Sequence, residues 1–228
     1  SLDNTRGEIH ATDNLNIQVN QGIINQQGAL VSSQAVILSA QNIDNTKGDI
    51  YSGKAMTVTA SQALTNNEGV IVANDHLSIF SGKLDNVLGQ ITAKETVQIT
   101  ATGPVNNQDG LFAAQKNLSV SAGGALDNTR GQIASVTENV SINASDQLIN
   151  QSGIIQSTQK IEIISSGLNN QSGKIISDTL DINASTQALN NDQGQIVGTD
   201  IQIKSGALSN NAGLIQSGTT LKINTNGQ

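Results

Sequence analysis

Short runs of alternating apolar and polar residues recur along the whole chain. In the first run the apolar side chains are Leu15 and Ile17, and a later copy has Ile161 and Ile163. A period of two residues is typical of a β-strand with one buried face, whereas an amphipathic helix repeats every 3.6 residues. The pattern therefore predicts short strands that turn one face to a core and the other to solvent.

These strands belong to a repeat of 19 to 22 residues. Each unit has the form apolar-x-Asn-x-x-Gly-x-apolar-x-small, followed by a short gap and apolar-x-apolar, and all four apolar positions are kept in all eleven units. The repeated asparagines are Asn4, Asn25, Asn45, Asn66, Asn86, Asn107, Asn128, Asn150, Asn170, Asn191 and Asn210. The repeated glycines are Gly7, Gly28, Gly48, Gly69, Gly89, Gly110, Gly131, Gly153, Gly173, Gly194 and Gly213.

A tandem of such units predicts an all-β fold, a right-handed parallel β-helix of about 11 coils with three short strands in each coil. Stacked coils let each strand pair in parallel with its equivalent one coil away, and parallel crossovers are nearly always right-handed. At about 4.8 Å per coil the rod is about 50 Å long. We expect residues 1–228 to form a single β-helix segment, and, since neither end has a polar cap, an excerpt of a longer filament.

The repeated asparagine is expected to form a structural ladder. Its amide group both donates and accepts hydrogen bonds, so identical side chains in adjacent coils can bond each other. The glycine three residues later is expected to adopt a positive φ in the same corner. A row of asparagines that binds a ligand is the alternative interpretation. The small residue, for example Ser32 or Ser52, is expected to point inward, with serine hydroxyls bonding the backbone of the next coil.

The aspartates that precede the ladder asparagine follow a second pattern. Asp3, Asp44, Asp85 and Asp127 occur on alternate coils. Two carboxylates directly opposite each other on neighbouring strands would repel. The alternation keeps these carboxylates apart and indicates that a pair of coils is the unit of the repeat.

Composition and charge exclude several classes of function. The chain has no cysteine, which excludes a disulfide framework, a Cys-ligated zinc site and thiol catalysis. Its net charge of −7 has the wrong sign for binding nucleic acid. Only Tyr51, Phe80 and Phe112 are aromatic, which fits a core of uniform aliphatic layers.

The sequence offers no arrangement of residues for catalysis or metal binding. Enzymes built on β-helices need clustered carboxylates, often with calcium, but the 18 acidic residues here are spread over eleven coils. The two histidines, His10 and His76, lie about three coils apart, too far to share one metal. We expect no catalytic residues, no metal, no cofactor and no small-molecule substrate.

Two units show a family resemblance with particular clarity. Residues 126–133 (LDNTRGQI) and 168–175 (LNNQSGKI) resemble filamentous-haemagglutinin-type repeats, and the resemblance covers the entire chain. Such repeats occur in the long exoproteins of Gram-negative two-partner secretion, among them filamentous haemagglutinin adhesins and the effectors of contact-dependent growth inhibition. The resemblance implies a β-helix that forms part of a filament projecting from the outer membrane.

The function that the resemblance implies is that of a shaft or stalk. The chain would belong to a secreted exoprotein, attached to the outer-membrane surface, which displays an adhesive, receptor-binding or toxin region away from the cell. Implied partners are an outer-membrane transporter during secretion and, through other regions, a host-cell or bacterial surface receptor. The alternative is a binding module whose solvent face itself recognises a host glycan or a receptor on a neighbouring bacterium, a hypothesis motivated by apolar residues expected to be exposed: Tyr51, Phe80, Val87 and Leu88.

Overall fold

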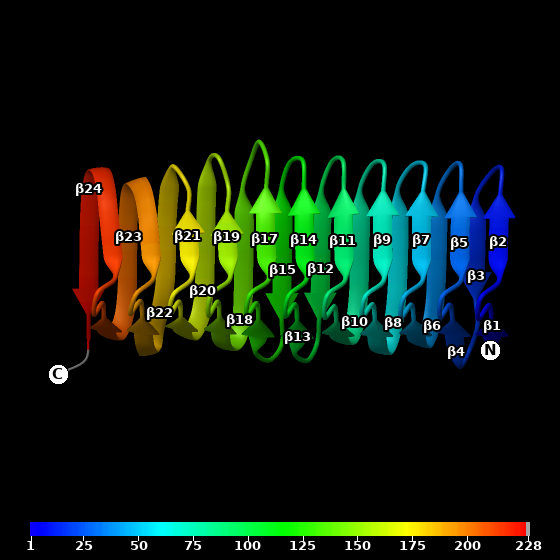
Figure 1. The fold of residues 1–228 in the computed structure, drawn as a ribbon, viewed down its shortest axis with the longest axis horizontal. Coiled ribbons are helices and arrows are strands. Elements are labelled where there is room, and N and C mark those ends of the chain that lie inside the picture. The colour runs from blue at the N-terminus through cyan, green and yellow to red at the C-terminus, as the bar shows by residue number, and fades with distance from the viewer. Residues whose placement is uncertain (227–228) are drawn as a thin grey trace.

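The computed structural model describes residues 1–226, apart from the side chains of residues 185 and 186. It confirms the predicted right-handed parallel β-helix (Figure 1). The chain ascends on the near side, descends on the far side and advances from the blue end to the red end, which makes the coil right-handed. No helix among the described residues is long and apolar enough to span a membrane.

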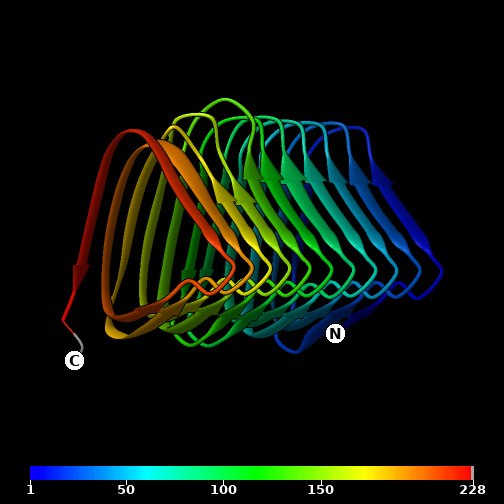
Figure 2. The same cartoon turned by 60° about the vertical axis from the view of Figure 1, so that its left-hand side comes forward.

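Each coil contributes one strand segment to each of three faces. The oblique view of Figure 2 shows these faces as the three sides of a coil. Face 1 follows the repeated glycine. It consists of β2 (Glu8–Ala11), β5 (Ala29–Ser32), β7 (Asp49–Ser52), β9 (Val70–Ala73), β11 (Gln90–Ala93), β14 (Leu111–Ala114), β17 (Gln132–Ser135), β19 (Ile154–Gln156), β21 (Lys174–Ile176) and the first parts of β23 (Gln195–Ser209) and β24 (Leu214–Thr225).

Face 2 and face 3 share several long strands. Face 2 consists of β3 (Leu15–Gln18), β12 (Val97–Ala101), β15 (Leu118–Ala122), the first parts of β6 (Val36–Asp44), β8 (Met56–Thr65), β10 (Leu77–Asp85), β18 (Val140–Ile149), β20 (Lys160–Asn169) and β22 (Thr179–Asn190), and later parts of β23 and β24. Face 3 consists of β1 (Leu2–Asp3), β4 (Gly22–Ile24), β13 (Val105–Asn106), β16 (Leu126–Asp127) and the last parts of β6, β8, β10, β18, β20, β22 and β23.

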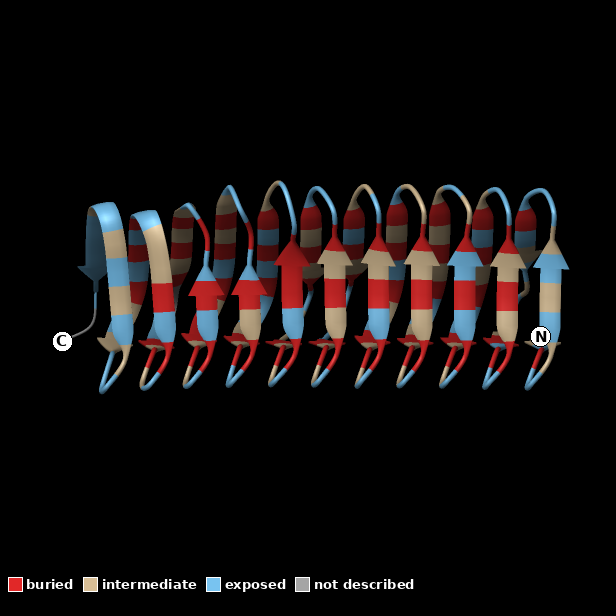
Figure 3. Cartoon of the chain, turned by 45° about the horizontal axis from the view of Figure 1, so that its top comes forward, coloured by how far each residue is buried: buried red, intermediate tan, exposed pale blue. Residues whose placement is uncertain are grey.

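The parallel register places equivalent residues of adjacent coils opposite each other. On face 1, for example, Ile50 pairs with Leu30 on one side and with Ile71 on the other. The four apolar positions of each unit therefore form four continuous columns, and in the nine inner coils every one of these side chains is at most 2% exposed. In the first and last coils most of them are partly exposed, because one side has no neighbouring coil (Figure 3).

A further inward position, besides the four apolar residues, the asparagine and the small residue of face 1, closes the cross-section, and the sequence repeat did not reveal it. It is the small residue that ends the face 2 part of each inner coil, such as Ala60, Ser81 and Ala101, which pair with one another across the coils. The register becomes irregular directly after it, for example between Ser81 and Lys83. The small side chain thus lies inside the bend where the chain passes from face 2 to face 3.

Candidate functional site: the asparagine corner and the outward faces

The structure places the eleven repeated asparagines in one column, at the turn from face 3 to face 1. We call this turn, from the repeated asparagine to the repeated glycine, the asparagine corner. The Nδ2 atom of each asparagine donates to the Oδ1 atom of the asparagine in the next coil at 2.7 to 2.8 Å, from Asn4 through to Asn210. Every asparagine from Asn25 to Asn191 is fully buried.

Each amide group also bonds the backbone around it. The Nδ2 atom of Asn107 donates to the carbonyl oxygen of Gly110 at 3.3 Å and to that of Gln132 at 3.2 Å, in addition to Oδ1 of Asn128. The Oδ1 atom of Asn107 accepts from Asn86. A buried amide keeps its place in a protein when its donors and acceptors are satisfied, and here they are satisfied internally. The column therefore presents no polar atom of its inner coils to a ligand.

The structure corrects the expected backbone conformation of the corner. None of the described glycines has a positive φ, so the prediction that the repeated glycine adopts one is wrong. The left-handed residue is the one before the glycine in all eleven coils, with φ between 53° and 59°: Arg6, Gln27, Lys47, Glu68, Leu88, Asp109, Arg130, Ser152, Ser172, Gln193 and Ala212.

Close packing explains why glycine follows. A Cβ atom at Gly110 would collide with the backbone carbonyl oxygen of Asn86 and lie 2.6 Å from Oδ1 of Asn107. The ten repeated glycines from Gly28 to Gly213 each face the carbonyl oxygen of the preceding coil's asparagine in the same way. Glycine is required here because the coils approach too closely for a side chain, and not because of φ.

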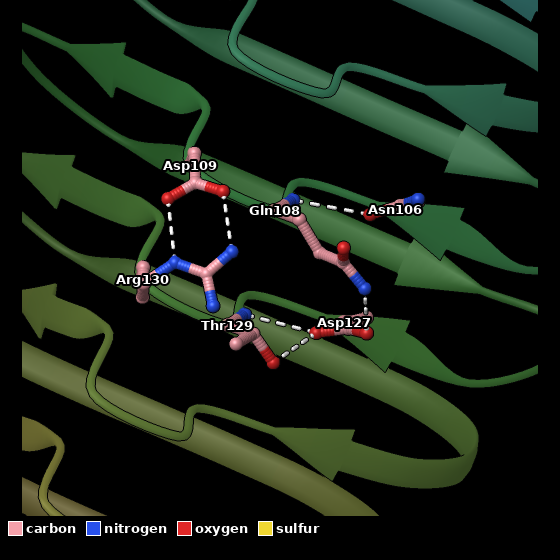
Figure 4. A network of polar contacts seen from close by, with 6 residues as sticks. All are labelled: Asn106, Gln108, Asp109, Asp127, Thr129 and Arg130. Carbon is pink, nitrogen blue, oxygen red and sulfur yellow. Dashed lines mark hydrogen bonds and ion pairs between the residues drawn. The ribbon is translucent and has the colours of Figure 1, made fainter.

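A polar network covers the outside of the asparagine corner (Figure 4). The Oδ1 atom of Asp127 accepts hydrogen bonds from the backbone N–H and the hydroxyl of Thr129 at 2.9 and 2.6 Å. The amide of Gln108, one coil earlier, donates to Oδ2 of Asp127 at 2.6 Å. Arg130 forms a bidentate pair with Asp109 at 2.8 and 2.7 Å. Each aspartate here thus has an amide or a guanidinium in the adjacent coil.

The same arrangement recurs at Asp44 and lowers carboxyl pKa values. Desolvation acts to raise the pKa of Asp44, but the hydroxyl of Thr46, the amide of Gln26 and the backbone N–H of Thr46 donate to its carboxylate and lower the pKa overall. The pKa of Asp109 is lowered chiefly by the hydrogen bond from Arg130. Hydrogen bonds from Thr5 lower the pKa of Asp3, and those from Ser209 and Asn211 lower that of Asp192.

The inward serines of face 1 serve the stacking of the coils. The hydroxyl of Ser52 donates to the carbonyl oxygens of Gln34 at 2.8 Å and Ala55 at 2.9 Å, and the hydroxyl of Ser32 donates to the carbonyl oxygen of Asp13. Ser32 and Ser52 thus bond the backbone of the preceding coil, whereas we expected them to bond the backbone of the next coil. These hydroxyls are held by backbone acceptors, away from the two histidines, both of which are exposed.

The four apolar residues that we expected to be exposed do not form one patch. Tyr51 lies on face 1, Phe80 on face 2, and Val87 and Leu88 at the asparagine corner, where Val87 is half-buried and Leu88 is exposed. Among the described residues no group of three or more His, Asp or Glu side chains is placed to hold a metal ion. The outward surface therefore differs from face to face, while the interior is the same in every inner coil.

Comparison with protein families identifies the repeat. The model of the haemagglutinin repeat matches residues 6–79, 67–148 and 135–228, which together span nearly the whole chain. The chain belongs to the haemagglutinin-repeat family. This confirms the resemblance seen in the repeated units, and haemagglutinin repeats characterise a structural and adhesin family of secreted, cell-surface exoproteins. Comparisons with curated proteins and with solved structures find no match.

The ladder can be tested at its centre. Replacing Asn107 by alanine removes the donor to Oδ1 of Asn128 and one of the two acceptors of Nδ2 of Asn86, which keeps the carbonyl oxygen of Gly89. We expect the free energy of unfolding to fall by about 1–3 kcal/mol, measured by denaturant titration. Asn143→Ala, at an exposed position on face 2, is the matched control and should change it by less than about 0.5 kcal/mol. Equal effects of the two substitutions would refute the ladder.

The close approach of the coils gives a second prediction. Gly110→Ala should destabilise the protein by about 1–3 kcal/mol, since the added methyl group must displace the chain around Asn86. Gly22→Ala is the control, because a Cβ atom there would be in ordinary contact, 3.5 Å from the carbonyl oxygen of Asn42. Thermal unfolding of both variants measures the difference, and a Gly110→Ala protein as stable as the parent would contradict the steric argument.

The lowered carboxyl pKa values predict acid sensitivity. Asp3, Asp44, Asp109 and Asp192 each have a folded-state pKa below the unfolded value. Their contribution to stability is complete above the unfolded pKa of about 3.9 and is lost as the pH falls through the folded pKa. The unfolding free energy should therefore be level from about pH 8 to pH 5 and decrease towards pH 2. Changing the four aspartates to asparagine should flatten this decrease, and an unchanged pH profile would count against it.

Proposed function

We propose that this segment is a structural shaft in a secreted, cell-surface exoprotein of the haemagglutinin-repeat family. The shaft carries an adhesive, receptor-binding or toxin region at a distance from the bacterial cell. The observation that supports the proposal most directly is continuity: the apolar columns and the asparagine column run from the first coil to the last without an interruption. The role is mechanical and needs no catalytic residue.

The bonding between coils suits a shaft. Adjacent coils are joined by parallel strand pairing on all three faces and by one amide-to-amide bond at the asparagine corner. A load that bends the rod must strain many such bonds in the same layer, so the segment resists bending. Because each repeat adds one coil, the reach of the filament increases in proportion to the number of repeats.

The proposal includes a route to the cell surface. An outer-membrane transporter passes the chain unfolded, and the β-helix then forms outside the cell. Two features of the chain support this route. It has no cysteine that could form a disulfide on the way. Each coil contacts only its neighbours, so folding can nucleate and propagate coil by coil as the chain emerges.

Small-angle X-ray scattering of a lengthened chain tests the shaft. A tandem duplication of residues 4–209 adds ten coils in register, so the rod should lengthen from about 50 to about 100 Å. Its radius of gyration is then about 30 Å, against about 22 Å for a globular protein of that size. A radius near 22 Å would exclude a continuous rod.

Binding of the present chain to cells or glycan arrays would instead favour the alternative, in which the solvent face is itself the binding site.

A further inference from the structure

Face 1 presents an apolar surface to solvent. In each strand two side chains alternate with the buried ones, and in β9 these are Val70 and Val72. From β9 to β19 none of these outward side chains is charged. The strands of face 1 lie side by side with little rotation from coil to coil (Figures 1 and 3). Flat sheets of many strands are unusual in solution and are commonly stabilised by stacking on another sheet.

The outward side chains of face 1 form two rows along the rod. Row A is the residue directly after the repeated glycine, and row B is the residue two positions later. Row A alternates between polar and apolar residues up to the eighth coil and then loses the alternation: Glu8, Ala29, Asp49, Val70, Gln90, Leu111, Gln132, Ile154, Lys174, Gln195 and Leu214. Row B is mostly apolar between its two ends: His10, Val31, Tyr51, Val72, Thr92, Ala113, Ala134, Gln156, Ile176, Val197 and Gln216. The acids of row A lie towards the N-terminal end and its base towards the C-terminal end.

We propose that face 1 binds face 1 of a second copy of this chain, with the two rods antiparallel and the twofold axis at the coil of Leu111. A twofold axis parallel to the strands of face 1 sets row A of one copy against row A of the other, with the coils of the second copy in reversed order. Leu111 then faces its own equivalent, Val70 faces Ile154, and Gln90 faces Gln132. One coil further out, Asp49 faces Lys174 of the other copy, which gives two opposite-charge pairs across the interface.

Row B is complementary in the same register. Ala113 faces its own equivalent, Tyr51 faces Ile176 and Val31 faces Val197. Tyr51 and Ile176 are 37% and 38% exposed in the single chain, so both have surface to bury. One axis position thus pairs Asp49 with Lys174 and sets most apolar residues of the inner coils against apolar residues. Val72 faces Gln156, and towards the two ends Glu8 faces Leu214 and Ala29 faces Gln195.

Other arrangements lose these pairings. In a parallel pair of rods row A faces row B of the same coil, which sets Asp49 against Tyr51 and Lys174 against Ile176 and leaves both charges unpaired. Moving the antiparallel axis by half a coil sets Leu111 against a glutamine. Moving it by one coil towards the N-terminus pairs Glu8 with Lys174 and loses Asp49, and it leaves the last two coils of each copy outside the contact. Opposite charge across an interface fixes orientation, so the charge distribution of row A selects the antiparallel pair, and the overlap of all eleven coils favours the axis at Leu111.

The area of the face is sufficient for a specific but modest dimer. Four residues of strand by eleven coils measure about 13 by about 50 Å, or about 650 Å² for each copy. The total of about 1,300 Å² lies at the lower end of specific protein interfaces, which bury about 1,200–2,000 Å². We therefore expect a concentration-dependent dimer in solution.

Sedimentation equilibrium of the full 228-residue chain tests the proposal. The parent should show a monomer–dimer equilibrium below about 200 μM, and Leu111→Lys, which sets two ammonium groups against each other on the axis, should weaken it at least tenfold. Phe80→Lys is the matched control on face 2, where Phe80 is 42% exposed, and should leave dimerisation unchanged. A parent that stays monomeric, or a dimer that Leu111→Lys does not weaken, would overturn the proposal.

Charge exchange tests the orientation separately. Asp49→Lys and Lys174→Asp should each weaken the dimer several-fold, because each sets like charges against each other. The double variant restores both opposite-charge pairs and should recover the parent affinity. Failure of the double variant to recover, with both single variants weakened and circular dichroism showing intact β-structure in all three, would refute the antiparallel register.

Discussion

The spacing between coils governs the whole structure. Every side chain lies about 4.8 Å from the side chain at the same position in the next coil, because parallel strands pair at that distance. A residue type is therefore compatible with a column only if it tolerates a close copy of itself on both sides. Leu, Ile and Val meet this condition by packing, and the nine inner coils accordingly bury them at all four apolar positions, with Met56 and Phe112 as the two exceptions in residue type. Asparagine meets it by bonding, since its amide presents a donor to one neighbour and an acceptor to the other.

The same spacing explains the residues that the columns avoid. A column of aspartates would set carboxylates against each other, and in this column Asp44 instead lies between Ile24 and Thr65, and Asp127 between Asn106 and Ile149. The amides of Gln26 and Gln108 in the preceding coil donate to the two carboxylates. At the repeated glycine the spacing leaves no room for even a methyl group, because the carbonyl oxygen of the preceding asparagine occupies the place of a Cβ atom. Apolar packing, amide bonding, charge alternation and the glycine requirement thus have one geometric cause.

The sequence predicted the parts of the structure that this spacing imposes on every coil. The handedness, the three strands and the apolar columns followed from the repeat. The left-handed residue could not be predicted, because its side chain points to solvent and its type varies freely, from Arg6 to Glu68 to Leu88. The glycine beside it was the natural candidate for a positive φ, but the contact that requires glycine comes from another coil. The inward position at the end of face 2 was missed because alanine and serine at positions such as Ala60 and Ser81 are too common in this chain to stand out.

Charge alternation also accounts for the apolar character of face 1. The corner aspartates and the polar residues of row A occupy the same coils: Asp3 with Glu8, Asp44 with Asp49, Asp85 with Gln90 and Asp127 with Gln132. Since like charges about 4.8 Å apart repel, the acids Glu8 and Asp49 of row A are favoured when the adjacent coil carries no second acid. In row A that adjacent coil carries Ala29 or Val70, and Leu111 and Ile154 continue the alternation. Up to the eighth coil, the alternation that keeps carboxylates apart at the corner thus coincides with an apolar side chain at every second position of row A, with a period of about 9.6 Å along the rod. A surface with that period is matched best by another surface with the same period, which is the reason to look for its partner in a second copy of the chain.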